Sequence, residues 1–287
     1  MFNPNAVFVS PSSIADFSKC PQLYYYRNVY RSPRGLKIQL INPSLALGQV
    51  VHDTLSQFLT LPPLSRDKDE LLRIFEVIWE GVSGEKGGFA SKSEEGEFIQ
   101  RAKAMLDRFW GNKHFQETEM VKIPSFPKVE LGNDIILTGK LDWIEKDEEG
   151  YHVIDFKTGK NEEREDSLQL PIYAVLASHI LNTPMIRASY WYLDKDDKIV
   201  PFNLPDLKVT FADLQQRGAV IKMVRQTQSY RCQSGGESCW ACRDILAVAK
   251  GKGKLVTVDP VNRKQEIYIM VKDEVKNEIE TPDDLPF

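Results

Sequence analysis

The pattern of hydrophobic and polar positions divides the chain into a helical first half and a second half of mixed strands and helices. In the first half, apolar side chains recur at helical spacing in four segments, residues 10–28, 45–59, 67–82 and 93–110, with a Gly-rich loop before the last. Ser12 or Ser13 is the predicted N-cap of the first helix. The pattern therefore predicts a helical N-terminal region.

The second half is typical of strands separated by helices. Segments rich in β-branched and aromatic residues predict strands at 119–123, 135–145, 151–157, 186–194, 254–258 and 265–271. Helices are predicted at 167–181, with Pro171 in the first turn, and at 211–227. This order predicts an α/β fold, with a mixed sheet, a crossover helix and a Cys-rich cap.

Composition and charge exclude several classes of protein. The 287 residues are 42% hydrophobic and 27% charged, as in an ordinary soluble domain, and the formal net charge of −4 indicates no global affinity for polyanions. No apolar run approaches a membrane span, and the first residues lack the pattern of a signal peptide. We therefore expect a cytoplasmic protein without a membrane partner, whose four cysteines are reduced.

Charged residues stand unusually among the strand residues of 139–160. A two-residue turn at Glu148–Glu149 would place Asp142 opposite Asp155, and a turn one residue later would place it opposite Lys157. In both registers Asp142, Asp155 and Lys157 share one face, while Leu141, Trp143, Ile154 and Phe156 share the other.

Two neighbouring carboxylates repel each other unless a cation lies between them. Such a pair suits Mg²⁺ or Mn²⁺, and a nearby lysine could orient a water that attacks a phosphodiester. The alternative is a solvent-facing hairpin with an Asp–Lys ion pair.

Three further motifs accompany this hairpin. His52 follows Gly48 in a predicted helix, and Gln169 and Tyr173 lie four residues apart on one helix face. The stretch from Ser12 to Arg27 combines aromatic and charged residues around a Cys-Pro pair. In this order the motifs resemble the RecB-family exonuclease branch of the PD-(D/E)XK nuclease superfamily, which includes the CRISPR-adaptation nucleases and the AddB C-terminal nuclease.

The resemblance implies a restriction-endonuclease-like fold, a central mixed sheet flanked by helices, and a set of site residues. His52, Asp142, Asp155 and the Phe156 carbonyl would bind the divalent metal. Lys157 would handle the attacking water, and Gln169 and Tyr173 would position DNA or the lysine. We expect one nuclease domain at 1–272, with a helical insert at about 61–115 and a Cys-rich cap at about 230–250.

The cysteines form a separate group. Cys239 and Cys242 have the spacing of a metal knuckle, and Cys232 lies shortly before them, whereas Cys20 is far away in the chain. The resemblance implies a structural [4Fe-4S] cluster bound by all four thiolates. In the family the knuckle pair commonly precedes the third cysteine, whereas here Cys232 comes first, so zinc is the alternative.

Two patches are candidates for nucleic-acid contact. One combines aromatic and basic residues and the other is basic; they comprise Tyr24, Tyr25, Tyr26, Arg27, Tyr30 and Arg31, and Arg217, Lys222, Arg225 and Arg231. The alternative for the tyrosines is packing in the core. We expect DNA, as single strands or duplex ends, to be the substrate.

The chain ends in an acidic segment, 273–287, that predicts a disordered tail. Its last five residues, Asp283, Asp284, Leu285, Pro286 and Phe287, resemble the tip of bacterial single-stranded-DNA-binding proteins, which docks repair enzymes. The tail is therefore a candidate for binding proteins that receive that tip. The leading prediction is a metal-dependent DNA exonuclease in repair, recombination or processing; the alternatives are a CRISPR-adaptation nuclease that trims spacers and a non-catalytic DNA-binding scaffold.

Overall fold

The computed structural model describes residue 3 and residues 5–184 and 186–271, so the predicted tail at 273–287, including the tip Asp283–Phe287, lies outside the described residues. The α-helices are α1 (Pro11–Lys19), α2 (Pro21–Tyr24), α3 (Pro43–Phe58), α4 (Lys68–Glu80), α5 (Lys92–Gly111), α6 (His114–Glu117), α7 (Gln169–Leu181), α8 (Leu207–Thr227) and α9 (Arg243–Ala249). A π-helical turn, η1 (Tyr25–Val29), follows α2, and short 3₁₀ turns lie at η2 (Pro63–Ser65) and η3 (Gly84–Gly87).

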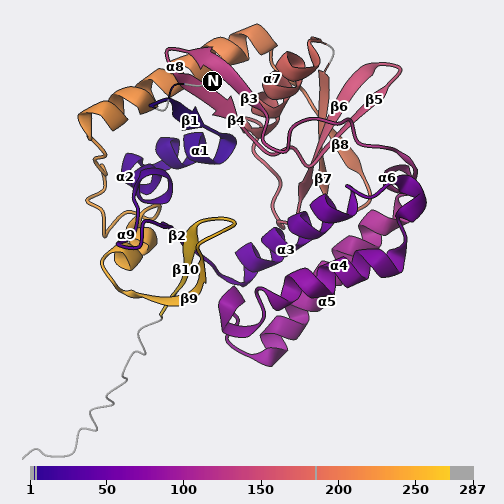
Figure 1. The fold of residues 1–287 in the computed structure, drawn as a ribbon, viewed down its shortest axis with the longest axis horizontal. Coiled ribbons are helices and arrows are strands. Elements are labelled where there is room, and N and C mark those ends of the chain that lie inside the picture. Colours follow the sequence, from indigo (N-terminus) through magenta and orange to yellow (C-terminus); the bar gives the residue numbers. More distant parts are fainter. Residues whose placement is uncertain (1–2, 4, 185, 272–287) are drawn as a thin grey trace, which may run out of the picture.

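The strands are β1 (Val7–Val9), β2 (Lys37–Leu40), β3 (Lys128–Gly132), β4 (Ile135–Thr138), β5 (Trp143–Asp147), β6 (Gly150–Lys157), β7 (Ile186–Tyr192), β8 (Ile199–Phe202), β9 (Gly253–Asp259) and β10 (Gln265–Met270). They form three mixed sheets in the orders β5-β6-β7-β8, β1-β4-β3 and β2-β10-β9. Helices flank these sheets, so the predicted α/β class is confirmed (Figure 1).

The four-stranded sheet is buried on both faces. Side chains such as Trp143, Ile154 and Phe156 pack into a core shared with α3, α4 and α5. The opposite face, with Val153 and Tyr190, packs against a second core that includes α7 and the β1-β4-β3 sheet. Because neither face meets solvent, any ionised group on these strands must find a partner inside the protein.

The β5–β6 hairpin has the first of the two predicted registers. Asp147 pairs with Gly150 and Trp143 with Ile154, so the turn is Glu148–Glu149. Continued by one residue, this register places Asp142 opposite Asp155. Leu141 was expected beside Trp143, but it packs in the second core, because regular alternation begins only at Trp143.

Four sequence-based expectations about these elements are wrong. The predicted strand 119–123 is irregular, and the predicted strand 135–145 is interrupted between β4 and β5. The first helix is capped by Ser10 instead of Ser12 or Ser13, because Pro11 takes the first helical position. That helix also ends early, since Cys20 precedes a proline and adopts an extended conformation (φ −168°, ψ 123°).

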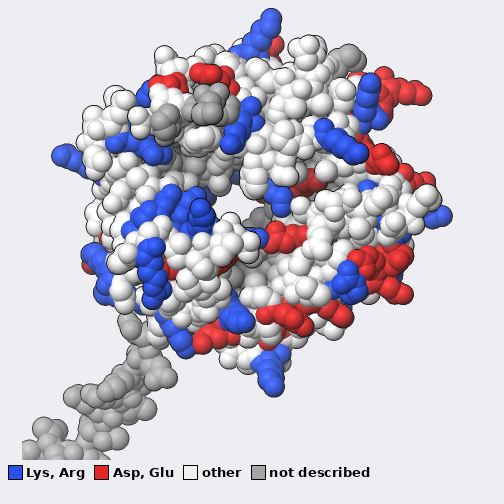
Figure 2. Space-filling view, viewed as in Figure 1, with Lys and Arg blue, Asp and Glu red and all other residues white. Residues whose placement is uncertain are grey.

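The β2-β10-β9 sheet, α2, η1 and α9 form a small unit, here called the cysteine lobe (residues 20–40 and 232–270). Figure 1 shows α2, α9 and this sheet together, away from the β5–β8 sheet. The lobe is tied to the rest of the protein by Val256 and Ile269, which pack against the first core, and by an ion pair between Lys254 and Glu85. Figure 2 shows a hollow at the centre of this face, with Lys and Arg side chains gathered along one side of it. No helix in the described part of the chain is long and apolar enough to cross a membrane.

Candidate functional site

Two glycines let the elements of the site approach each other closely. A Cβ atom at Gly139 would lie 3.0 Å from Leu176 Cδ1 and 3.1 Å from Tyr173 Cε1, so the segment before β5 passes directly against α7. A Cβ atom at Gly48 would lie 3.1 Å from Thr158 Oγ1, so α3 lies against the loop that follows β6. The glycines therefore bring His52 and Tyr173 towards the carboxylates of the hairpin.

Asp142 lies in the break between β4 and β5 and has two partners. His52 Nδ1 lies 3.1 Å from Asp142 Oδ1, and the backbone N–H of Phe156 donates to Asp142 Oδ2 at 3.0 Å. These bonds connect α3, the strand break and β6. Of the predicted ligands, His52 and Asp142 are thus in direct contact.

Asp155 faces a second set of predicted residues. Lys157 Nζ lies 3.0 Å from Asp155 Oδ2, and the Gln169 amide donates to Asp155 Oδ1 at 2.8 Å. Gln169 also accepts from Lys157 Nζ at 2.5 Å and donates to the Tyr173 hydroxyl at 3.2 Å. The first turn of α7 therefore binds the carboxylate and the lysine at once, which brings all four of these residues together.

Sequence reasoning missed Glu163. Its carboxylate lies 3.1 Å from Lys157 Nζ, and its backbone N–H donates to the Tyr192 hydroxyl at 3.1 Å. An acidic run in a loop is typical of a solvated surface, so no local signal separates this residue from its neighbours. Lys157 consequently lies between two carboxylates.

Burial and mutual charge set the ionisation of the site. Burial raises the pKa of Asp155 to about 7, and the nearby charge of Asp142 adds to the shift. Burial also opposes ionisation of Asp142, but the His52 ring holds the pKa of Asp142 below its usual value. Burial disfavours the charged form of Lys157, yet Asp155 and Glu163 outweigh it and raise the lysine pKa. Asp155 therefore changes charge near neutral pH, and His52 is a second titrating group of the site, because burial disfavours its charged form but Asp142 outweighs burial and raises the pKa of the His52 ring.

A divalent cation suits this set of donors. Oδ2 of Asp155 is buried 3.0 Å from the Lys157 ammonium, and no neutral donor among the described residues satisfies it. A cation between Asp155 and Asp142 would offset both burial and repulsion, and carboxylate oxygens are the ligands preferred by Mg²⁺ and Mn²⁺. The residues present therefore fit the predicted metal.

The four cysteines lie together in the cysteine lobe. Their sulfur atoms are all within 4.8 Å of one another, and the pair Cys232–Cys242 is 3.8 Å apart. Among the described residues they are the one compact group of three or more His, Cys, Asp or Glu ligand atoms; His52, Asp142 and Asp155 do not converge as closely. Cys20, Cys239 and Cys242 are buried. The group can hold a metal.

Backbone geometry also prepares these thiols. A hydrogen bond from the Gly236 N–H is the main reason that the pKa of Cys232 is lowered to about 7. Burial, in contrast, raises the pKa of Cys20 and Cys242. Cys20 lies between α1 and α2, and Cys242 directly precedes α9. A metal bound here would link two parts of the chain that are more than two hundred residues apart.

The predicted DNA-contact residues have mixed surroundings. Tyr24 is fully buried, as the core alternative expects, and Tyr25, Tyr26 and Tyr30 are half-buried in a cluster with Tyr230. Arg27 is ion-paired with Asp16 at 2.8 Å, whereas Arg31 donates to backbone carbonyls.

In the second patch, Arg217 pairs with Asp213, Lys222 pairs with Asp134, and Arg225 lies beside the Tyr24 hydroxyl. Arg231 is exposed. Only part of each patch is therefore open to a ligand.

Fold and site together define an α/β protein with a buried aspartate, a partly buried aspartate and a lysine on adjacent strand ends. The sequence profile of the PD-(D/E)XK nuclease superfamily matches residues 9–244, which is most of the chain. The chain therefore belongs to the PD-(D/E)XK nuclease superfamily, whose members are nucleases that typically use Mg²⁺ or Mn²⁺. The comparison with curated proteins found no match.

Proposed function

We propose that this chain is a metal-dependent deoxyribonuclease of the RecB-like exonuclease branch. The observation that carries the proposal is the buried Asp155 carboxylate, which lies between Lys157, Gln169 and the Asp142–His52 pair. A non-catalytic scaffold gains nothing from this arrangement, because burial of charged groups is costly and neighbouring carboxylates repel each other.

The proposed metal ligands are His52, Asp142, Asp155 and the Phe156 carbonyl. A bound Mg²⁺ or Mn²⁺ would polarise the scissile phosphate and lower the pKa of a water molecule. Asp142 is held for this role by His52 and by the Phe156 N–H, which fix both of its oxygens.

Lys157 supplies a positive charge and N–H donors beside the reacting phosphate. Asp155 and Glu163 keep it protonated, so it acts by orienting water and stabilising negative charge that develops on the phosphate. Gln169 holds the Lys157 ammonium and the Asp155 carboxylate in one arrangement, and the Tyr173 hydroxyl accepts the second N–H of the same amide. Gln169 and Tyr173 are thus positioning residues.

A groove of about 730 Å³ supports access of a DNA strand to this site. It runs between α1 and the loop before α7, and its walls include Ser12, Ala15, Ser18 and Gln169. The small side chains of α1 leave room for a chain, and Gln169 at one wall connects the groove with Asp155.

The test offers the purified protein end-labelled linear DNA and closed-circular DNA, each single- and double-stranded, with Mg²⁺ or Mn²⁺. An exonuclease degrades linear DNA and spares circles, whereas cleavage of circles would contradict end-dependent action. Asp155→Asn serves as the inactive comparison, and exposed Asp197→Asn serves as the matched control. No cleavage of any substrate by the wild type would refute the nuclease proposal.

We further propose that the four thiolates hold a structural metal centre. The resemblance to iron–sulfur nucleases supports a [4Fe-4S] cluster. The sulfur spacing favours a single zinc ion, because Zn–S bonds of about 2.3 Å place tetrahedral sulfurs about 3.8 Å apart. In a cluster each thiolate binds a different iron, so the sulfurs lie farther apart.

Anaerobic purification distinguishes the [4Fe-4S] cluster from the single zinc ion at the four cysteines. A brown protein with broad absorbance near about 400 nm and bound iron identifies the cluster. A colourless protein with one zinc per chain identifies the single ion. Protein without either metal would contradict both.

The terminal residues Asp283–Phe287 are proposed to bind proteins that receive the tip of single-stranded-DNA-binding protein. Phe287 would supply the apolar anchor, and the two aspartates would favour basic rims. A nonapeptide of residues 279–287 should bind such a protein and lose binding when Phe287 is deleted. Equal binding without Phe287 would refute this role.

A further inference from the structure

A groove of about 520 Å³ lies where the cysteine lobe meets the nuclease core. The core side includes Asp53, which follows the proposed ligand His52, and Lys140, which lies two residues before Asp142. The lobe side includes Lys37 and Arg263. The groove is therefore adjacent to the nuclease site along the chain and depends on both parts of the protein for its walls.

Cations outnumber acids in this groove. Four of the lining residues are basic, Arg27, Lys37, Lys140 and Arg263, and two are acidic, Asp16 and Asp53. Lys37 makes no ion pair with an acid among the described residues, and burial together with Arg31 lowers its pKa. Lys37 is exposed on the wall of the groove, and an exposed cation that no acid pairs with is a position where a bound phosphate would be favourable.

Asp53 pairs with two basic residues, one from each side of the groove. Arg263, at the β9–β10 turn, forms an ion pair with Asp53 Oδ2, and Lys140 Nζ lies 3.9 Å from Asp53 Oδ1. One carboxylate thus contacts a cation from the lobe and a cation from the core. A phosphate of a nucleic-acid backbone has the charge and the oxygens to take this place.

Phe126 adds an exposed aromatic ring to the same groove, where 61% of its surface is accessible. Exposed aromatic rings beside cations are the surfaces on which unpaired bases stack, whereas the bases of a duplex are already stacked on each other. Phosphate contacts alone would not distinguish single-stranded DNA from duplex DNA, whereas stacking on the Phe126 ring would select for unpaired bases.

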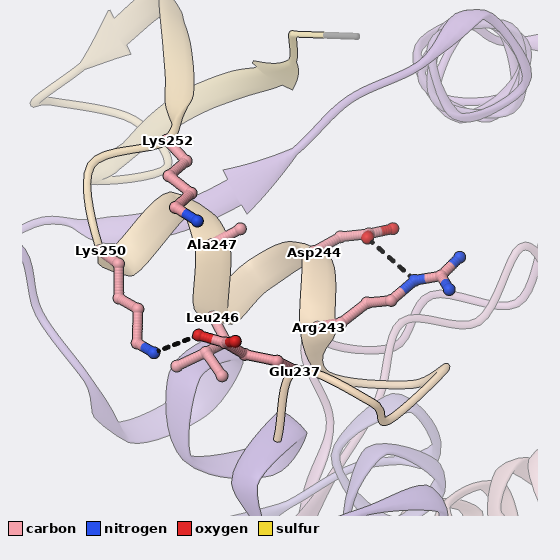
Figure 3. A pocket seen from close by; sticks show the side chains of 7 residues that line it. All are labelled: Glu237, Arg243, Asp244, Leu246, Ala247, Lys250 and Lys252. Carbon is pink, nitrogen blue, oxygen red and sulfur yellow. Dashed lines mark hydrogen bonds and ion pairs between the residues drawn. The ribbon is translucent and has the colours of Figure 1, made fainter. Parts of the chain in front are cut away.

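A second pocket on the cysteine lobe also has more cations than acids but lacks the aromatic ring. Figure 3 shows a pocket of about 230 Å³ beside α9, in which Lys250 is paired with Glu237 at 2.8 Å and Arg243 with Asp244 at 3.3 Å. Two of its three cations have local partners, Lys252 is the third, and no aromatic side chain lines the pocket. Positive charge on the lobe is therefore not sufficient to define a nucleic-acid site.

We propose that the groove between lobe and core binds a single-stranded DNA segment next to the nuclease site. Lys37, Lys140 and Arg263 bind its phosphates, and Phe126 stacks on one base. Asp53 occupies the place of a phosphate in the free protein. This inference deepens the proposed deoxyribonuclease function and rests on it.

The test measures binding of fluorescein-labelled oligothymidylate and of a blunt hairpin duplex by anisotropy, in an Asp155→Asn background that does not cleave. Lys37→Gln should weaken binding of the single strand about threefold or more and reduce the slope of log affinity against log salt by about 0.7. Phe126→Ala should weaken it about fivefold or more with no change in that slope. Asp53→Asn should strengthen binding.

Lys252→Gln, from the pocket of Figure 3, is the matched control and should bind as the background protein does. Binding by Lys37→Gln and Phe126→Ala equal to that of the control would overturn the proposal. Equal loss on the blunt hairpin duplex would overturn the assignment to single strands. A wild type that cleaves while these variants bind normally refutes the groove alone, whereas a wild type that cleaves nothing refutes the nuclease function.

Discussion

The nuclease site and the cysteine group are both candidate metal centres, but they are assembled in opposite ways. Asp142, Asp155 and Lys157 come from one hairpin, and their charges are largely compensated by protein partners. The four thiols come from the two ends of the described chain and have few partners except one another. We therefore expect the nuclease site to persist without a metal and the cysteine lobe to depend on one.

Loss of a cysteine should have the largest effect on stability. Cys20→Ser should remove the bound metal and lower the free energy of unfolding of the lobe by about 5 kcal/mol or more, because metal binding supplies folding energy in such sites. Metal analysis, thermal melting and limited proteolysis of the lobe measure this. Ser18→Ala, an exposed neighbour on α1, is the control. Unchanged metal content and melting temperature would show that the cysteine lobe does not depend on a bound metal for its stability.

Loss of a carboxylate in the nuclease site should have the opposite effect, because it reduces activity and leaves stability unchanged or higher. Asp155→Asn should reduce the cleavage rate by about a thousandfold, or about 4 kcal/mol of activation free energy, while the metal-free protein melts at the same or a higher temperature. The amide removes the repulsion with Asp142 but keeps the shape. A marked fall in melting temperature would mean that Asp155 is mainly structural.

Gln169→Ala should have a smaller effect on the same reaction. The variant frees Lys157 and Asp155 from their common partner, so we expect a loss of about 10- to 100-fold in the single-turnover rate with little change in DNA affinity. Gln216→Ala, on an exposed position of α8, is the matched control. A change in affinity without a change in rate would place Gln169 in DNA binding instead.

The pH dependence of stability should be the smallest effect. Burial and Asp142 raise the pKa of Asp155 to about 7 in the folded protein, above the ordinary value of 3.8. A carboxyl group with a raised pKa favours the folded state while it is protonated, so its contribution is lost as pH rises through about 7. The metal-free protein should therefore melt at a lower temperature at pH 8.5 than at pH 5.5.

Asp155→Asn should flatten this dependence relative to the wild type, and added Mg²⁺ should do the same. An equally steep dependence in Asp155→Asn would assign the titration to another group.

The hairpin and its charged face could be predicted from the sequence because both depend on local rules. Period-two alternation and the turn residues determine which residues face each other in β5 and β6, and the observed register is one of the two predicted. The α7 pair Gln169 and Tyr173 follows from helical spacing in the same way. The family was therefore indicated by short-range patterns.

The parts that were missed depend on contacts between distant segments. The β2–β10 pairing joins residue 37 to residue 265. Residues 37–40 alternate polar and apolar side chains as a strand does, but no local pattern identifies the distant strand with which they pair. Glu163 and Asp53 gain their roles from partners across the fold. The proline after Cys20, in contrast, was visible in the sequence, and its effect on the preceding residue explains why the first helix ends there.

The parallel pairing of β2 with β10 also has a consequence for the order of folding during synthesis. β2 is made early, but its partner leaves the ribosome only after more than two hundred further residues. The β5–β8 sheet can close before then, since its strands end at residue 202. The lobe, and with it Lys37 and Arg263 of the groove, is thus completed last, so that a nascent chain in which the proposed nuclease site is complete would still lack the proposed groove for single-stranded DNA.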